Sequence, residues 1–73
     1  MTQPVVTLED FKVAVRDFCL EIDTLNEREL DNAFSALSGM YFQIDPTPLN
    51  LILAPSTLVF ASRRYNERRY QLA

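Results

Sequence analysis

Apolar residues in the first third of the chain recur at spacings of three and four, which is the period of an amphipathic helix. The pattern predicts a helix over residues 8–22. Thr7 is suited to cap it, because Glu9 and Asp10 would then lie in the first turn, where carboxylates interact favourably with the positive end of the helix dipole. The predicted apolar face consists of Leu8, Phe11, Val15, Phe18 and Ile22.

A second helix is predicted over residues 27–38. Asn26 and Glu29 have the spacing of a capping box, the strongest local helix-start signal in the sequence. The only glycine, Gly39, lies where a left-handed C-terminal cap is expected. The short connection over residues 23–26 favours an antiparallel hairpin of the two helices. The second apolar face consists of Leu30, Ala33, Phe34 and Leu37.

The last third of the chain is interrupted by proline. Residues 40–44 are apolar and too few for their periodicity to distinguish a strand from a packed connector. Residues 45–48 should break regular structure, and residues 49–53 could form a helical turn that Pro55 interrupts. A final helix is predicted over residues 56–70, with arginine on its outer side. Its inner side is expected to carry Leu58, Ala61, Tyr65 and Leu72.

These elements predict a mainly α protein, a compact three- or four-helix domain, with a short strand pair left open by residues 40–44. Residues 1–62 are expected to form the helical domain, and residues 63–73 a basic C-terminal segment, either a helix end or a tail, of the same domain. The first two helices should pack face to face. Their expected contact residues are Leu8, Phe11, Val15, Phe18, Ile22, Leu30, Phe34 and Leu37.

Composition supports a small folded protein without covalent or metal cross-links. The 73 residues are 48% hydrophobic, with one cysteine and no histidine. Cys19 is expected to be a core residue of a protein in a reducing cytoplasm. No apolar stretch is long enough to span a bilayer, and residues 1–7 lack the pattern of a signal peptide. A cytoplasmic location and no membrane contact are therefore expected.

Charge is distributed unevenly along the chain, whose net charge is −3. Residues 1–31 carry eight acids against three bases, whereas residues 63–73 carry four arginines against one acid. The two ends of the sequence therefore differ in sign.

The residue types that most catalytic and metal sites need are scarce. Without histidine, neither a Cys–His nor a Ser–His–Asp arrangement is possible. One glycine cannot supply a phosphate-binding loop, and no loop alternates acids in the manner of a calcium site. We therefore expect no enzyme, no catalytic residue, no metal and no cofactor. Binding to a larger partner is the remaining class of function.

The C-terminal segment contains the strongest candidates for partner binding. Arginine and tyrosine are enriched in interface hot spots, because each presents a flat surface with hydrogen-bond donors. Basic residues among aromatic ones also fit a nucleic-acid contact, and a solvated helix end paired with first-helix acids such as Glu9 or Asp17 is a third interpretation. The candidates are Arg63, Arg64, Tyr65, Arg68, Arg69 and Tyr70.

Tyr41 is a further candidate within an aromatic cluster. It lies between Met40 and Phe42, directly after the predicted helix cap. Filling the core is the simpler role for these three side chains, and an exposed Tyr41 would instead favour a contact with a partner.

The chain as a whole, from Met1-Thr2-Gln3-Pro4 through the Arg63-Arg64 and Arg68-Arg69 pairs to Ala73, resembles the small transcription regulators of lytic bacteriophages that infect plant-pathogenic bacteria. The resemblance covers the full length and rests on no short diagnostic motif. It implies binding to host RNA polymerase at the N-terminal segment of the β′ subunit and at the β flap. It also implies hindered σ-dependent promoter recognition and suppressed intrinsic termination, that is, antitermination.

Two other functions remain open. One is a small phage interaction or assembly module that acts on another host or virion protein. The other is a nucleic-acid-binding protein, although the net negative charge and the acidic first half disfavour it, because phosphates would be repelled. No direct, specific nucleic-acid contact is therefore expected.

Overall fold

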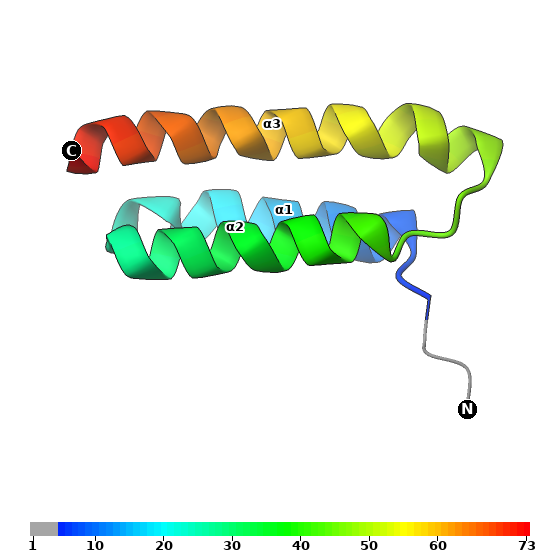
Figure 1. Cartoon of the computed structure of the whole chain (residues 1–73), viewed down its shortest axis with the longest axis horizontal. Coiled ribbons are helices and arrows are strands. Elements are labelled where there is room, and N and C mark those ends of the chain that lie inside the picture. Colours follow the sequence, from blue (N-terminus) through cyan, green and yellow to red (C-terminus); the bar gives the residue numbers. More distant parts are fainter. Residues whose placement is uncertain (1–4) are drawn as a thin grey trace.

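The computed structural model describes residues 5–73 and contains three α-helices in one bundle (Figure 1). Helix α1 spans Leu8–Glu21, α2 spans Glu27–Phe42 and α3 spans Pro48–Leu72, and a 3-10 helix, η1, at Ile22–Thr24 joins α1 to α2. The mainly α fold is confirmed, with three helices. Residues 1–4, which begin the predicted 1–62 domain and the segment inspected for a signal peptide, lie outside the described part.

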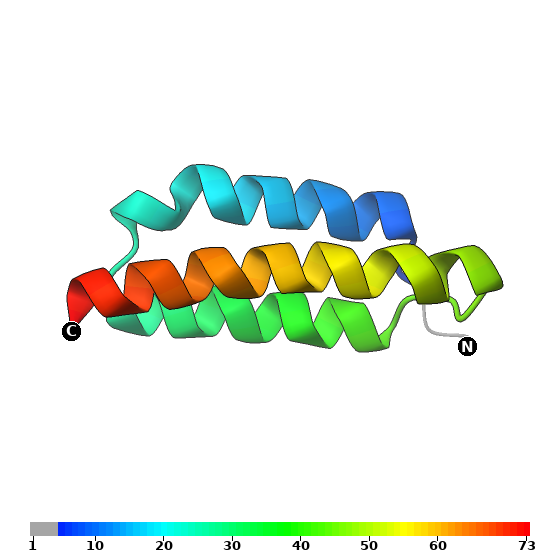
Figure 2. The same cartoon turned by 90° about the horizontal axis from the view of Figure 1, so that it is seen from above.

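The helices run up, down and up. In Figure 1, α1 and α3 run in one direction and α2 runs in the other. Seen from above, α3 partly covers α2 and α1 lies to its other side (Figure 2); α3 contacts both helices. The predicted hairpin of α1 and α2 therefore forms the base on which the third helix packs.

Each α-helix begins at a capping side chain. The Asp10 amide donates to Thr7 Oγ1 over 3.0 Å, and the Asn50 amide donates to Thr47 Oγ1 over 3.3 Å. At α2 the capping box is complete: the Glu29 amide donates to Asn26 Oδ1 over 2.8 Å, and the Asn26 amide donates to Glu29 Oε1 over 3.1 Å. These bonds satisfy amides that have no partner within the helix. The caps predicted at Thr7 and Asn26 are therefore confirmed.

The predicted end of α2 at Gly39 is wrong. The helix continues to Phe42, and Gly39 lies within it without a positive φ. The physical reason is burial: Met40 and Tyr41 pack against the core, and the helical conformation keeps them on its inner side. The cap is Gln43, whose amide donates to the Met40 carbonyl over 3.0 Å.

The predicted interruption at Pro55 is also wrong, because α3 passes through this residue. Proline has no amide hydrogen, so the Leu51 carbonyl loses its donor four residues on. Leu51 is an exposed residue, so water can donate a hydrogen bond to its carbonyl. Ala54 and Ala61, on either side of Pro55, are both buried on the side of α3 that faces the other two helices. This packing keeps α3 continuous.

Residues 40–44 do not form a strand. Met40, Tyr41 and Phe42 belong to the last turn of α2, and Ile44 makes an isolated parallel bridge to Val6. The Val6 amide donates to the Gln43 carbonyl over 3.2 Å. Within residues 5–73 the strand pair left open by the sequence is thus reduced to one bridge.

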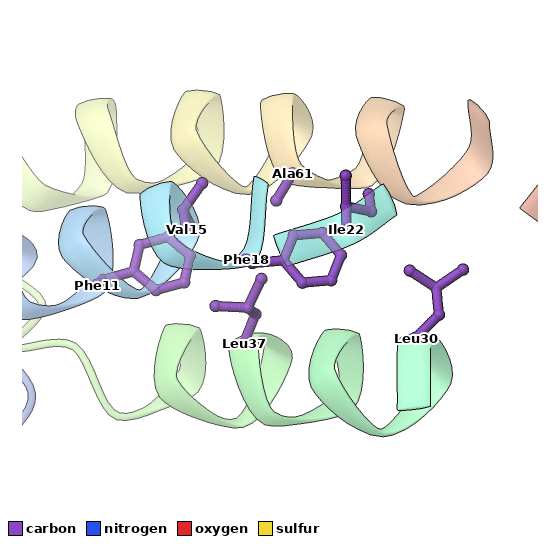
Figure 3. Packing of buried hydrophobic residues seen from close by; sticks show 7 residues of the cluster. All are labelled: Phe11, Val15, Phe18, Ile22, Leu30, Leu37 and Ala61. Atoms are coloured by element: carbon purple, nitrogen blue, oxygen red, sulfur yellow. The ribbon is translucent and has the colours of Figure 1, made fainter. Parts of the chain in front are cut away.

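The core lies where the three helices meet (Figure 3). The predicted face-to-face packing of α1 and α2 is confirmed for most residues, while Phe34 is half-buried beside the core and Leu8 lies outside the cluster. The buried cluster consists of Phe11, Val15, Phe18, Ile22, Leu30, Leu37 and Ala61.

Truncation of Phe18 should be severe, because its ring is buried and lies 6.3 Å from that of Phe34. We expect Phe18→Ala to lower the free energy of unfolding by about 3 to 5 kcal/mol, measured by urea denaturation. Leu20→Ala is the control: Leu20 is largely exposed, so its truncation should change stability little. A Phe18→Ala protein that melts within a few degrees of the parent would contradict this core.

Pro55→Ala should stabilise the protein, since alanine restores an amide donor to the Leu51 carbonyl in the middle of α3. We expect the free energy of unfolding to rise by about 1 to 3 kcal/mol, less than the full helix penalty of proline because the unfolded chain also gains freedom. Urea denaturation measures the change. A less stable Pro55→Ala protein would mean that the ring of Pro55 makes a contact worth more than the missing hydrogen bond.

Candidate protein-docking surface

The C-terminal arginines and tyrosines lie in the last turns of α3, beside the start of α2. Tyr65 donates its hydroxyl to Asp31 Oδ1 over 2.6 Å, and Arg69 Nη1 donates to both carboxylate oxygens of Asp31 over 2.9 Å. Arg69 Nη1 also lies 3.1 Å from Glu27 Oε1. These contacts tie the end of α3 to the first turns of α2.

The ring of Tyr65 is packed as well as hydrogen-bonded. It stacks on Phe34 with ring centroids 4.4 Å apart. The hydrogen bond to the Asp31 carboxylate raises the pKa of the Tyr65 phenol, and desolvation adds to the rise. The same carboxylate, through its negative charge, raises the pKa of the Arg69 guanidinium. Tyr65 is therefore a structural residue of the α2–α3 contact.

Arg68 holds the turn between η1 and α2. Its Nη2 donates to the Asp23 carbonyl over 3.0 Å and to the Leu25 carbonyl over 3.2 Å. These bonds join carbonyl groups of a connecting segment to the last turns of α3, while Arg68 Nε is buried without a hydrogen-bond partner. Arg68 is thus occupied within the molecule.

The other predicted residues of this segment face solvent. Tyr70 is 85% exposed, and Arg63 is exposed and has no ion pair within residues 5–73. Arg64 is half-buried and pairs with Glu67 over 3.0 Å. Of the six candidates in the segment, Arg63 and Tyr70 are therefore the most available to a partner.

The intramolecular pairing differs from the one that the sequence suggested. The solvated-end interpretation expected partners on the first helix, such as Glu9 or Asp17. Among the described residues, the arginines instead pair with Glu27 and Asp31 of α2 and with Glu67 of α3 itself. The physical reason is the way α3 packs on the other two helices, which places its last turns beside the start of α2.

Tyr41 is half-buried and packs against the core, with its ring 6.1 Å from that of Phe11. Its neighbour Phe42 is 82% exposed at the end of α2. The aromatic cluster therefore divides between core and surface, and Phe42, which was not a candidate, is the more accessible ring.

The outer side of α3 carries large apolar residues that sequence reasoning missed. They are exposed by half or more, and Arg63 and Tyr70 continue their line toward the C-terminal end of the helix. A sequence signal was present, because apolar residues between positions 49 and 60 are too many and too widely spread for one helix face. We define the α3 face as Leu49, Ile52, Val59, Phe60, Arg63 and Tyr70.

Beside the α3 face, a groove of about 580 Å³ runs between α1 and α3. The surface of the groove is mostly apolar. Cys19 lies in it and also packs against the core, and burial raises the pKa of its thiol, an effect that the nearby Arg64 partly opposes. We define the α1–α3 groove as Lys12, Val15, Arg16, Cys19, Leu20, Ser56, Thr57 and Phe60.

Two further features are absent from residues 5–73, a helix that could cross a membrane and a cluster of side chains that could hold a metal ion. No helix there is both long and apolar enough to cross a bilayer. No three acidic, cysteine or histidine side chains there gather closely enough to hold a metal ion.

Comparison with known proteins adds no relative: no protein-family profile, no curated protein and no solved structure matches the chain.

The contact between Tyr65 and Asp31 predicts both a stability change and a pH effect. Tyr65→Phe keeps the stacking on Phe34 and removes the hydroxyl. We expect it to lower the free energy of unfolding by about 1 kcal/mol at pH 7, since Asp31 is partly solvated and keeps its bonds to Arg69. Urea denaturation of the two proteins measures the difference.

The sign of the pH effect follows from the raised pKa of Tyr65. Unfolded tyrosine loses its proton near pH 10, and folded Tyr65 does so at higher pH, so the folded state holds more protons between the two values. The contribution of Tyr65 is therefore complete below about pH 10 and is lost as the pH rises through the folded pKa. The gap in stability between the parent and Tyr65→Phe should narrow there, and a gap that widens would contradict the assignment.

Proposed function

We propose that this protein acts by docking on a larger protein through the α3 face, and that this partner is bacterial RNA polymerase. The observation that carries the docking proposal is a row of large apolar side chains on the outside of one helix. Ile52 and Phe60 are 68% and 55% exposed. Arg63 and Tyr70, the two free candidates of the C-terminal segment, extend the same face.

Such a face fits a protein interface better than a solvated surface. Burying a side chain of the size of Ile52 or Phe60 contributes about 1.5 to 3 kcal/mol. Contiguous exposed apolar patches with arginine and tyrosine at the edge are typical of interaction sites on small proteins. Since α3 is held firmly to α2 at its C-terminal end, the face is presented on a rigid element and loses little conformational entropy on binding.

The identity of the partner rests on the resemblance to phage transcription regulators. It favours host RNA polymerase, with contacts at the N-terminal segment of β′ and at the β flap, inside the host bacterial cell. The proposed action is to occupy a polymerase surface that σ-dependent promoter recognition and intrinsic termination require. Hindered promoter recognition and antitermination would then follow from occupancy, without chemistry.

The α3 face is tested by charge insertion at Ile52 and Val59, whose side chains are exposed and outside the core. We expect the double variant Ile52→Asp, Val59→Asp to bind purified host RNA polymerase at least about tenfold more weakly, a loss of about 1.4 kcal/mol or more. Titration with labelled protein measures the affinity.

The matched control is Val5→Asp, Phe42→Asp, which adds the same charge at exposed apolar positions that are not part of the α3 face. It should bind like the parent, and both variants should keep the parent's circular dichroism. Equal polymerase affinity of the parent and the α3 variant would sink the docking assignment.

A pulldown with the parent protein distinguishes the alternative functions. Immobilised protein should retain RNA polymerase from host lysate, and retention of another host or virion protein in its place would favour the interaction-module alternative. Retention of DNA or RNA that falls steeply with salt would favour the nucleic-acid alternative.

A further inference from the structure

We infer that the α1–α3 groove is a second contact surface, which takes an acidic amphipathic helix from the partner protein. This inference deepens the proposed function and rests on it for the identity of the partner, since it names the kind of segment that the partner contributes. It is carried by two independent properties of the groove, its shape and the sign of its charges.

The shape of the groove fits a helix. Helices α1 and α3 run in the same direction (Figure 2), and the lining residues on α1 extend from Lys12 to Leu20. This stretch is about 12 Å long, or about two helical turns. A helix laid antiparallel to both would become the fourth member of an up-and-down bundle, which is the packing that three such helices leave open. Recognition of a helix in an apolar groove is a common mode of protein binding.

The centre of the groove offers apolar anchors. Leu20 from α1 and Phe60 from α3 are 75% and 55% exposed while lining the same hollow. Val15 lies at its floor as a buried core residue, and Cys19 completes the apolar surface between them. Side chains at every third or fourth position of an incoming helix would fill this centre.

The rim of the groove is positive, although the protein as a whole is negative. Lys12 and Arg16 line it, and no carboxylate does. An adjoining hollow that shares Ser56 and Phe60 adds Arg63. Arg16 contacts Asp17 over 3.6 Å, but both side chains are exposed by more than half, and neighbours in a helix sequence do not face each other, so Arg16 remains available.

The opposite side of α1 shows that this positive rim is a local feature. The hollow between α1 and α2 is lined by Asp17 and Glu21 and by no cation. Over this part of α1, Lys12 and Arg16 line the hollow toward α3, whereas Asp17 and Glu21 line the hollow toward α2. A partner helix that carries carboxylates beside its apolar stripe matches the α1–α3 groove, whereas a basic helix does not.

The test uses synthetic peptides of about 14 residues, long enough to cover the groove. The first peptide has leucine at helical spacing and glutamate on both flanks of the leucine stripe. The second has lysine in place of every glutamate, and the third has proline at its centre, which breaks the helix. Fluorescence anisotropy with the full-length protein measures the affinities.

We expect the glutamate peptide to bind at least about tenfold more tightly than the lysine peptide and the proline peptide. Binding should also slow the alkylation of Cys19 by iodoacetamide, because the only thiol of the chain lies in the groove. Equal binding of the glutamate and lysine peptides, or alkylation of Cys19 at the same rate with and without the glutamate peptide, would overturn the inference.

Protein variants locate the contact. We expect Lys12→Glu, Arg16→Glu and, separately, Phe60→Glu to weaken binding of the glutamate peptide about tenfold or more. Arg28→Glu, on α2, is the control for charge, and Phe42→Glu is the control for an exposed apolar residue. Both controls should bind the peptide like the parent, and a control that weakens binding as much as the groove variants would overturn the location.

Sedimentation of the parent and of Phe60→Glu examines the competing occupant, a second copy of this chain. A parent dimer that becomes monomeric in Phe60→Glu would overturn the inference, because the groove would then be a self-association surface. A monomeric parent that binds the glutamate peptide supports it.

Polymerase binding by the same variants separates this inference from the proposed function. If Lys12→Glu, Arg16→Glu binds polymerase like the parent, the groove inference fails while the proposed function stands. If the glutamate peptide binds the groove and the parent protein does not bind polymerase, the groove assignment stands and the proposed function fails.

Discussion

The close seating of α3 on the α1–α2 hairpin is the constraint on which the rest of the structure depends. The buried side chains of α3 are Ala54 and Ala61, and their small size lets the helix approach its neighbours closely. A seat made of alanine is also narrow. Larger residues of α3, Leu58, Tyr65 and Leu72, pack beside these alanines and are only partly buried. Ile52 and Phe60 lie on the other side of the helix, where the proposed docking face is.

Polar contacts supplement the core at the C-terminal end of α3. The last turns of α3 contribute the partly buried Tyr65 and Leu72 to the core and also carry arginines. Asp31 receives Tyr65 and Arg69 there, and Arg68 binds the carbonyls of the η1–α2 connection. Because these pairs are partly solvated, each contributes little to stability. Together they set the direction of α3 and keep its outer face rigid.

The distribution of charge places the two proposed contact surfaces side by side. Lys12 and Arg16 of α1 line the α1–α3 groove, whereas Asp17 and Glu21 line the hollow toward α2. Phe60 belongs to both the groove and the α3 face, so the positive groove adjoins the apolar face. A partner that presents an acidic helix beside an apolar surface would meet both at once. Two adjoining contacts of modest strength bind far more tightly than either alone, provided that the partner's geometry lets both engage.

Local signals in the sequence determined the mainly α fold, the starts of α1 and α2, and the apolar faces that form the hairpin, because caps and periodicity act over a few residues. They misjudged Gly39 and Pro55, where burial of Met40, Tyr41 and Ala61 outweighs the local preference for a break. Among the candidate site residues, the sequence singled out the right helix end but could not separate Arg63 and Tyr70 from Tyr65, Arg68 and Arg69. Only the tertiary structure decided that, because whether an arginine is free depends on which carboxylates and carbonyls a distant helix brings within reach.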